Sequence, residues 1–122
     1  MDEQEFKERT QQLALRIIRL VQALPETPVG WVIGKQLLRS GTAIGVNYRA
    51  ACRGKSNADM AGKLAIVEEE ADETLYWLEL LIKAEILPEA KLEALMNETD
   101  EILAMTVASM KTLRRSAGFT RQ

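Results

Sequence analysis

Histidine is absent from this 122-residue chain, and cysteine occurs once, as Cys52. Without histidine, the sequence lacks the side chain that most often serves as a general base and as a metal ligand near neutral pH. A single cysteine has no partner within the chain for a disulfide, which favours a reducing compartment, and we expect the cytoplasm. We therefore expect no enzymatic activity, no metal site and no cofactor.

Long apolar runs and a basic excess are missing as well. No stretch approaches the ~18 consecutive apolar residues of a membrane helix, and the opening MDEQEFKERTQQ lacks the pattern of a secretory signal. Sixteen basic and 18 acidic residues give a net charge of −2, with a pI near 5.3. The protein as a whole therefore does not attract nucleic acid or an anionic membrane. We expect no membrane association, and nucleic-acid binding would need a local patch.

Aromatic residues make up 5% of the chain, whereas 47% is hydrophobic and 28% is charged. This balance is typical of a globular protein, and the abundance of Ala, Leu, Glu and Lys favours helices. A chain of this length buries enough surface for one core, so we predict a single domain over residues 1–122.

Apolar residues recur at alternating steps of three and four, and no segment sustains an alternation with a period of two. Breaks at Pro25, Pro28, Gly54 and Pro88 divide this pattern into helices at about 3–24, 28–53, 56–86 and 88–115. Such short connections join antiparallel neighbours, which predicts an all-α, up-down-up-down four-helix bundle. Gly54 is predicted to follow the second helix with a left-handed backbone.

The segment from Gly34 to Arg53 carries two opposed patterns on one predicted helix. One face forms a heptad seam for the core, made of Ile33, Leu37, Ser40, Ile44, Asn47 and Ala51. The opposite face forms a narrow stripe rich in basic residues, made of Lys35, Arg39, Thr42, Val46, Arg49 and Arg53. The helix also contains four glycines, which lower its propensity and predict a close approach by a neighbouring helix.

Four polar residues lie in or beside the predicted seams: Ser40, Asn47, Glu70 and Glu73. A buried polar group is costly unless it is paired. We predict that these side chains form hydrogen bonds across the core and fix the register of the helices. Two alternatives stay open, a small-molecule or ion site built from the same groups and simple exposure of the two glutamates.

Two catalytic arrangements fit the sequence poorly. The acids around Glu70 suggest a carboxylate-bridged di-iron bundle, but such sites use Glu-x-x-His pairs, and this chain has no histidine. Cys52 lies near Arg49, Arg53 and Lys55, a setting expected to lower the pKa of its thiol, yet no histidine is present to act as its base. We assign no catalytic residue.

The basic stripe is the candidate functional surface, formed by Lys35, Arg39, Arg49 and Arg53 with Lys55 beyond it. In one interpretation, it meets the acids of the third helix or of a neighbouring subunit, or is a solvated face. In the other, it binds the phosphate backbone of RNA or DNA, with a strong dependence on salt. Few aromatic residues are available for base stacking, which argues against sequence-specific recognition.

The residues from Thr74 to Ile82, TLYWLELLI, are apolar almost all round the third predicted helix. A helix with one buried face needs fewer apolar positions, which suggests a second interface. We predict a homo-oligomer whose contacts include Trp31, Leu38, Tyr76, Trp77 and Leu80.

Two segments carry a family resemblance, IGKQLLRSGTAIGVNYRAACRGKS and KLAIVEEEADETLYWLELL. They resemble the 23S ribosomal RNA intervening-sequence proteins, with the Arg39-Ser40 pair, Asn47 and Glu73 at the family's spacing. The resemblance runs from Phe6 through the fourth helix. It implies a small bacterial cytosolic protein, a left-handed bundle and assembly into a closed ring, with pentamers the form associated with such folds. The family has no settled biochemical activity, so the resemblance implies none for this chain.

The chain is also similar to the accessory variability proteins of diversity-generating retroelements. Those proteins share the bundle and the ring, and they bind nucleic acid and a reverse transcriptase. By that resemblance, the positions expected to contact nucleic acid are Lys35, Arg39, Arg49 and Arg53. The accessory proteins are strongly basic, whereas this chain is acidic overall.

Overall fold

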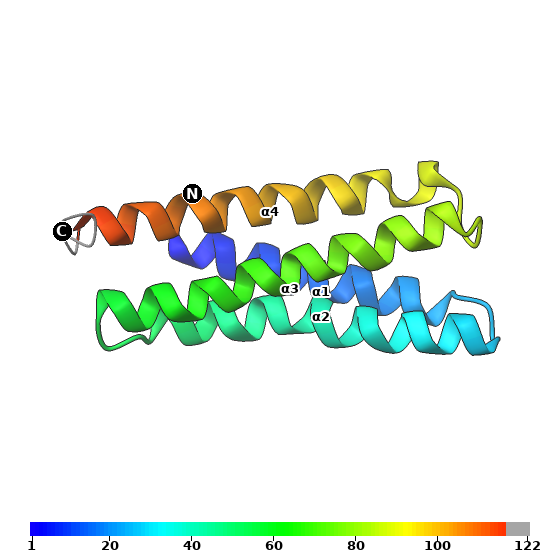
Figure 1. The fold of residues 1–122 in the computed structure, drawn as a ribbon, viewed down its shortest axis with the longest axis horizontal. Helices are drawn as coiled ribbons and strands as arrows, with labels where there is room; N and C mark the ends of the chain where they lie inside the picture. Colours follow the sequence, from blue (N-terminus) through cyan, green and yellow to red (C-terminus); the bar gives the residue numbers. More distant parts are fainter. Residues whose placement is uncertain (117–122) are drawn as a thin grey trace.

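The computed structural model describes residues 1–116 and contains four helices (Figure 1). Their bounds are α1 (Glu3–Gln22), α2 (Pro28–Cys52), α3 (Asn57–Lys83) and α4 (Glu89–Ser116). Consecutive helices run in opposite directions and are joined by short turns (Figure 1). The predicted all-α four-helix bundle is confirmed, and each helix end lies within three residues of its predicted position.

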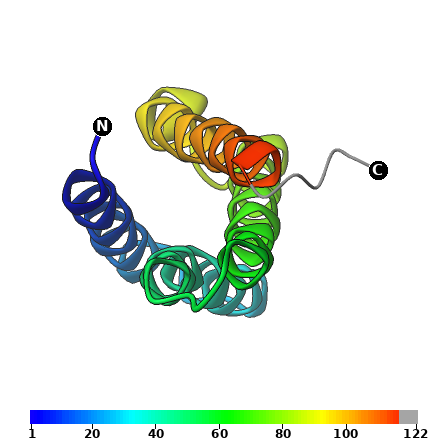
Figure 2. The ribbon, with the colours of Figure 1, turned by 90° about the vertical axis from the view of Figure 1, so that its left-hand side faces the viewer.

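The four helices surround the core unequally. The helix α2 packs against α1 and α3, and α3 packs against α2 and α4. The contact between α1 and α4 is the weakest of the contacting pairs, and the end-on view shows these two helices farther apart than the other neighbours (Figure 2). The two middle helices, α2 and α3, are therefore each held on both flanks.

Side chains cap the first three helices. The Asp2 carboxylate accepts a hydrogen bond from the amide of Glu5 at 2.8 Å, while the Glu5 carboxylate accepts one from the amide of Asp2 at 3.0 Å. At the start of α2 the Thr27 hydroxyl fills the same role, and at the start of α3 the Ser56 hydroxyl does so. These caps satisfy amides that have no partner inside the helix, and they fix where each helix begins.

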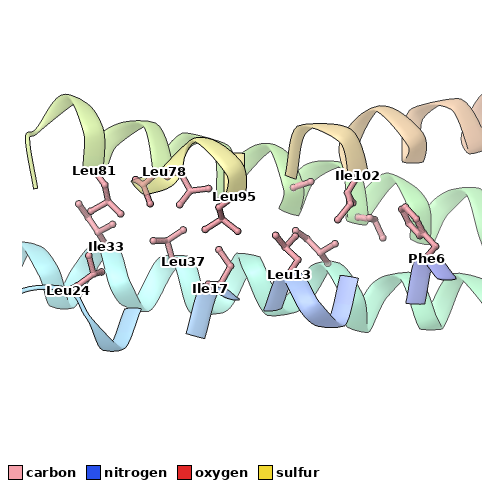
Figure 3. Packing of buried hydrophobic residues seen from close by; sticks show 14 residues of the cluster. Phe6, Leu13, Ile17, Leu24, Ile33, Leu37, Leu78, Leu81, Leu95 and Ile102 are labelled. Atoms are coloured by element: carbon pink, nitrogen blue, oxygen red, sulfur yellow. The ribbon is translucent and has the colours of Figure 1, made fainter. Parts of the chain in front are cut away.

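The buried side chains are those of the heptad seams. Leu13, Ile17, Leu37, Ile44 and Ile102 are fully buried. Figure 3 shows Leu13, Ile17, Leu37 and Ile102 along the axis of the bundle. The same continuous cluster contains Phe6, Leu24, Ile33, Val67, Ala71, Leu78, Leu81, Leu92 and Leu95. Burial of these apolar surfaces is the main stabilising contribution to the fold.

Glycines allow α1 and α2 to pack closely, as their number predicted. A Cβ atom added at Gly41 would lie 3.0 Å from both Cγ1 and Cγ2 of Ile17 in α1. One added at Gly45 would lie 3.3 Å from the hydroxyl oxygen of Thr10. The lower helix propensity of these glycines is thus offset by contact between the two helices.

This packing predicts opposite effects of the same substitution at two glycines. Gly41→Ala is expected to destabilise the protein by about 1–2 kcal/mol, because crowding against Ile17 exceeds the gain in helix propensity. Gly62 lies in α3 with nothing within 4 Å of its added Cβ atom. Gly62→Ala is therefore expected to stabilise the protein by up to ~1 kcal/mol. Urea unfolding measures both, and a stabilising Gly41→Ala would contradict the close packing.

The turns on either side of α3 differ from expectation. Gly54 does not have the left-handed backbone that we predicted. A glycine is needed there because a Cβ atom would overlap the Met60 side chain at the start of α3. The left-handed residue is instead Glu85, with φ of 58° in the turn after α3, where its amide donates to the carbonyl of Ile82 at 2.9 Å.

Candidate functional site

The candidate site lies on the side of α2 that faces away from the core. Because α1 and α3 cover the flanks of α2, this side forms part of the outside of the bundle (Figure 2). Val32 and Val46 are 60% and 68% exposed here, and Trp31 beside them is 62% exposed. We call this row the outer stripe of α2, and its members are Val32, Lys35, Arg39, Thr42, Val46, Arg49 and Arg53.

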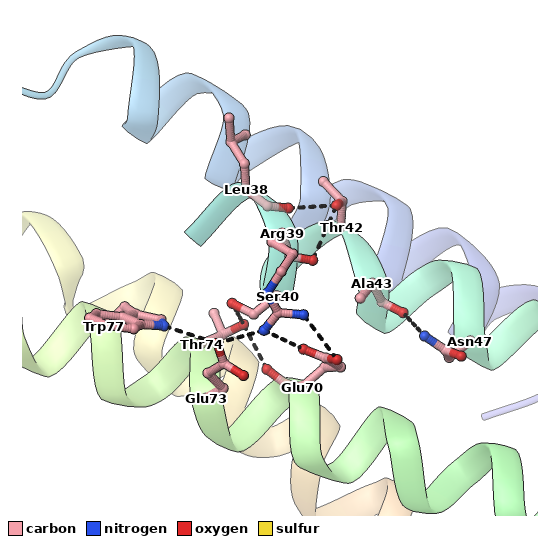
Figure 4. A network of polar contacts seen from close by, with 10 residues as sticks. All are labelled: Leu38, Arg39, Ser40, Thr42, Ala43, Asn47, Glu70, Glu73, Thr74 and Trp77. Carbon is pink, nitrogen blue, oxygen red and sulfur yellow. Dashed lines mark hydrogen bonds and ion pairs between the residues drawn. The ribbon is translucent and has the colours of Figure 1, made fainter. Parts of the chain in front are cut away.

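Arg39 reaches sideways from the outer stripe and ties α2 to α3 (Figure 4). Its guanidinium lies 2.5 Å from a carboxylate oxygen of Glu73 and 3.1 Å from one of Glu70. Glu73 also accepts a hydrogen bond from the indole nitrogen of Trp77 at 3.2 Å. The bond from Arg39 lowers the pKa of the Glu73 carboxyl against the opposing effect of burial. Both glutamates thus pair with the stripe and not across the core.

The Arg39–Glu73 pair predicts a pH dependence of stability. A carboxyl with a lowered pKa in the folded state stabilises the protein above its unfolded pKa, ~4.3 for Glu, and loses this contribution as pH falls through the folded value. Glu73→Gln is expected to destabilise at about pH 7 and to have little effect near pH 3 in urea unfolding. Glu79→Gln, at an exposed position of α3, is the control. An effect of Glu73→Gln that is equal at both pH values would contradict the pairing.

Ser40 and Asn47, both predicted to bond across the core, have different partners. Ser40 is fully buried, and its hydroxyl shares a 2.9 Å hydrogen bond with the hydroxyl of Thr74 in α3 (Figure 4). Asn47 is half-buried, and its amide donates to the carbonyl of Ala43 at 2.9 Å. The cross-core bond predicted for Asn47 is therefore wrong, because its short side chain reaches the preceding turn of its own helix.

The other basic residues of the candidate surface point into solvent. Lys35, Arg49, Arg53 and Lys55 are exposed, and within residues 1–116 none of them forms an ion pair. The helix α2 contains three basic and no acidic residues, whereas α3 contains seven acidic and two basic residues. The structure thus separates the candidate surface into Arg39, which is paired within the bundle, and four cations without an ion pair among the described residues.

The predicted interface residues fall on two different surfaces. Trp31 and Leu38 line a groove of about 400 Å³ between α1 and α2. Tyr76 lies on α3 and is 55% exposed, with its ring edge-to-face against Trp77 at 5.1 Å between centroids. Trp77 and Leu80 are half-buried and pack against the core of their own bundle. Most apolar residues of the TLYWLELLI segment pack inside the bundle, because α3 contacts both α2 and α4.

One polar cluster was missed by sequence reasoning. The guanidinium of Arg9 in α1 donates to both carboxylate oxygens of Glu98 in α4, at 2.8 and 2.7 Å, and lies 2.5 Å from Glu101. These bonds hold together the two helices with the weakest mutual contact. Sequence carries no signal for pairs so distant along the chain, since each residue alone is an ordinary charge beside a helical seam.

Cys52 lacks the activated thiol that its basic neighbours suggested. It lies half-buried near Tyr48 at the end of α2, and burial raises the pKa of the thiol. Within residues 1–116, no three side chains of His, Cys, Asp or Glu gather closely enough to hold a metal ion. In the same part of the chain, no helix combines the length and the apolar character needed to cross a membrane.

The architecture agrees with what comparisons with known proteins find. The sequence model of the family described as 23S rRNA-intervening sequence protein matches residues 2–108. The chain belongs to this family. The resemblance seen in the sequence is thus confirmed, and the match includes α1, α2 and α3 entirely and most of α4.

A solved structure is closely similar to this 23S rRNA-intervening sequence family member. It is the crystal structure of a protein with unknown function from the S23 ribosomal protein family of Bacteroides thetaiotaomicron VPI-5482. The chains are 39% identical, with a TM-score of 0.84, and the alignment covers 91% of this chain and 99% of that chain. Among proteins of curated function, none matches. Membership in the family therefore establishes the fold and supplies no reaction.

Proposed function

We propose that this chain acts as a non-enzymatic, homo-oligomeric interaction module whose subunits meet through the outer stripe of α2. The supporting observation is the exposure of Val32 and Val46 in the stripe and of Trp31 beside it, each of which is at least 60% exposed. Apolar side chains that gather on one face of a helix commonly mark a protein contact, because their burial in an interface is favourable. The single cysteine supports a reducing compartment, and we place the protein in the cytoplasm.

The assembly that we propose is a closed ring, with five subunits as the form implied by the family resemblance. A ring requires that two different surfaces of each subunit meet, so that the contact repeats until it closes. The outer stripe supplies one such surface, since it lies on a single side of the bundle (Figure 2). No chemistry at the stripe is needed for this role.

Size exclusion with light scattering tests the proposal. The wild-type protein is expected to have a mass several times that of the 13.7 kDa chain. Trp31→Asp with Val46→Asp is expected to shift the mass to that of a monomer, because a charge in a dry contact is strongly unfavourable. Leu15→Asp, at a 38% exposed position of α1, is the control and should leave the mass unchanged. A wild-type monomer at tens of micromolar would contradict the proposal.

Weak nucleic-acid binding without sequence preference is the alternative function. It is favoured by the exposed cations Lys35, Arg49, Arg53 and Lys55, which lack ion-pair partners within residues 1–116. Each phosphate contact would make binding more sensitive to salt. Reversing Arg49 and Arg53 to Glu should abolish such binding, measured by fluorescence anisotropy with labelled RNA. Unchanged binding would exclude the stripe as the nucleic-acid site. Arg39 is left unmutated in this variant, because its ion pairs with Glu70 and Glu73 belong to the fold.

A further inference from the structure

Most of the basic residues of α2 and the acidic residues of α3 form no ion pairs with each other among the described residues. Among the described residues, Arg39 forms the ion pairs that join these helices, to Glu70 and Glu73. The cations Arg49 and Arg53 have no acidic partner in residues 1–116. A surface with unpaired charges and exposed apolar side chains is complementary to one that carries the opposite charge around an apolar floor.

A groove between α3 and α4 has this complementary character. It has a volume of about 330 Å³ and is lined by Glu68, Glu69, Asp72, Leu103 and Val107. Its three carboxylates form no ion pair within the described residues. Its two apolar residues are half-buried, so part of each side chain remains open to a partner.

We infer that the outer stripe of α2 in one copy of this chain docks into the groove between α3 and α4 of the next copy. Val46 would contact the apolar floor formed by Leu103 and Val107, and Arg49 and Arg53 would meet the carboxylates. This inference rests on the proposed homo-oligomer and names its two contacting surfaces. Nothing in it requires a ligand or a second protein.

The spacing of the charges fits such a contact. Arg49 and Arg53 are four residues apart, and so are Glu68 and Asp72. Four helical residues rise about 6 Å, so both arginines can face the two carboxylates at the same time when the helices lie side by side. The stripe also has the alternating three- and four-residue steps of a helix that packs along a partner.

The position of the two surfaces favours a ring over a two-fold dimer. The stripe belongs to α2, whereas the groove belongs to the neighbouring side of the bundle formed by α3 and α4 (Figure 2). Because the two surfaces lie on different sides of the bundle, a copy that covers the stripe of its neighbour leaves the neighbour's groove uncovered. The contact is therefore head-to-tail, and every pair of subunits keeps a free stripe and a free groove. Such a contact repeats until it closes.

Charge reversal tests the inference in three variants. The first carries Arg49→Glu and Arg53→Glu, the second carries Glu68→Arg and Asp72→Arg, and the third carries all four changes. Each of the first two places like charges across the contact, so subunit affinity should fall by about a hundredfold or more. The third restores opposite charges in exchanged positions and should restore the wild-type mass in sedimentation velocity. The control reverses two exposed cations elsewhere, Arg19→Glu and Lys91→Glu, and should assemble normally.

Each outcome decides a different claim. Loss of assembly in both pairs with recovery in the fourfold variant supports the docking of stripe and groove. A wild-type oligomer whose mass is unchanged in both pairs overturns this contact and leaves the homo-oligomer standing. A wild-type monomer overturns the proposed function itself. Assembly that is lost in the first variant but not recovered in the fourfold variant also overturns the pairing, and labelled RNA then tests whether the stripe holds nucleic acid.

Discussion

Leu37→Ala is expected to lower the free energy of unfolding by about 3 kcal/mol. Leu37 is fully buried in the middle of α2, where it meets side chains from the other helices (Figure 3). Removal of three side-chain carbons there loses their burial and leaves a cavity that the rigid helices fill only in part.

Leu15→Ala is the matched control, because it deletes the same atoms at a position that is 38% exposed. Its cost is expected to stay below ~1 kcal/mol. Urea unfolding of both variants should be done at one protein concentration, since assembly adds to apparent stability. Equal costs at the two positions would contradict the described core.

Arg39→Ala is expected to destabilise the protein by about 1–3 kcal/mol, more than its own half-exposed position would suggest. The reason is Glu70, whose side chain is 17% exposed. One of its carboxylate oxygens has almost no access to solvent, and the Arg39 guanidinium at 3.1 Å compensates its charge. Without Arg39, the charge of this carboxylate has lost its nearest compensation.

A double-mutant cycle separates this effect from a general loss of surface charge. Glu70→Gln removes the buried charge, so adding it to Arg39→Ala should recover part of the lost stability. Lys35→Ala is the control at an exposed position of the same helix, with an expected change within about 0.5 kcal/mol. Additive effects of Arg39→Ala and Glu70→Gln would show that the pair is not coupled, contrary to the observed ion pair.

The architecture was predictable because its determinants are local. The seam of Ile33, Leu37, Ser40 and Ile44 is visible as a heptad pattern, and all four residues are buried. Prolines and capping residues mark the helix ends within three residues. Gly41 signalled close packing through its low propensity, although the sequence did not identify Ile17 as the residue that it meets.

The candidate surface was predictable as a stripe but not as a set of partners. Helical spacing places Arg39 and Arg49 on one side of α2. It does not predict that Arg39 forms ion pairs with α3, or that Arg49 has no ion-pair partner among the described residues. That difference depends on how α2 and α3 are rotated against each other. Asn47 shows the same limit, since the edge of a seam permits a bond either across the core or along its own helix.

Sedimentation velocity of the wild-type protein, at low and at moderate salt, tests the central claim that this chain works as a homo-oligomer. The account predicts one species with a mass that is a multiple of 13.7 kDa, and a subunit affinity that weakens as salt screens the contact between stripe and groove. A single 13.7 kDa species at tens of micromolar under both conditions would contradict it.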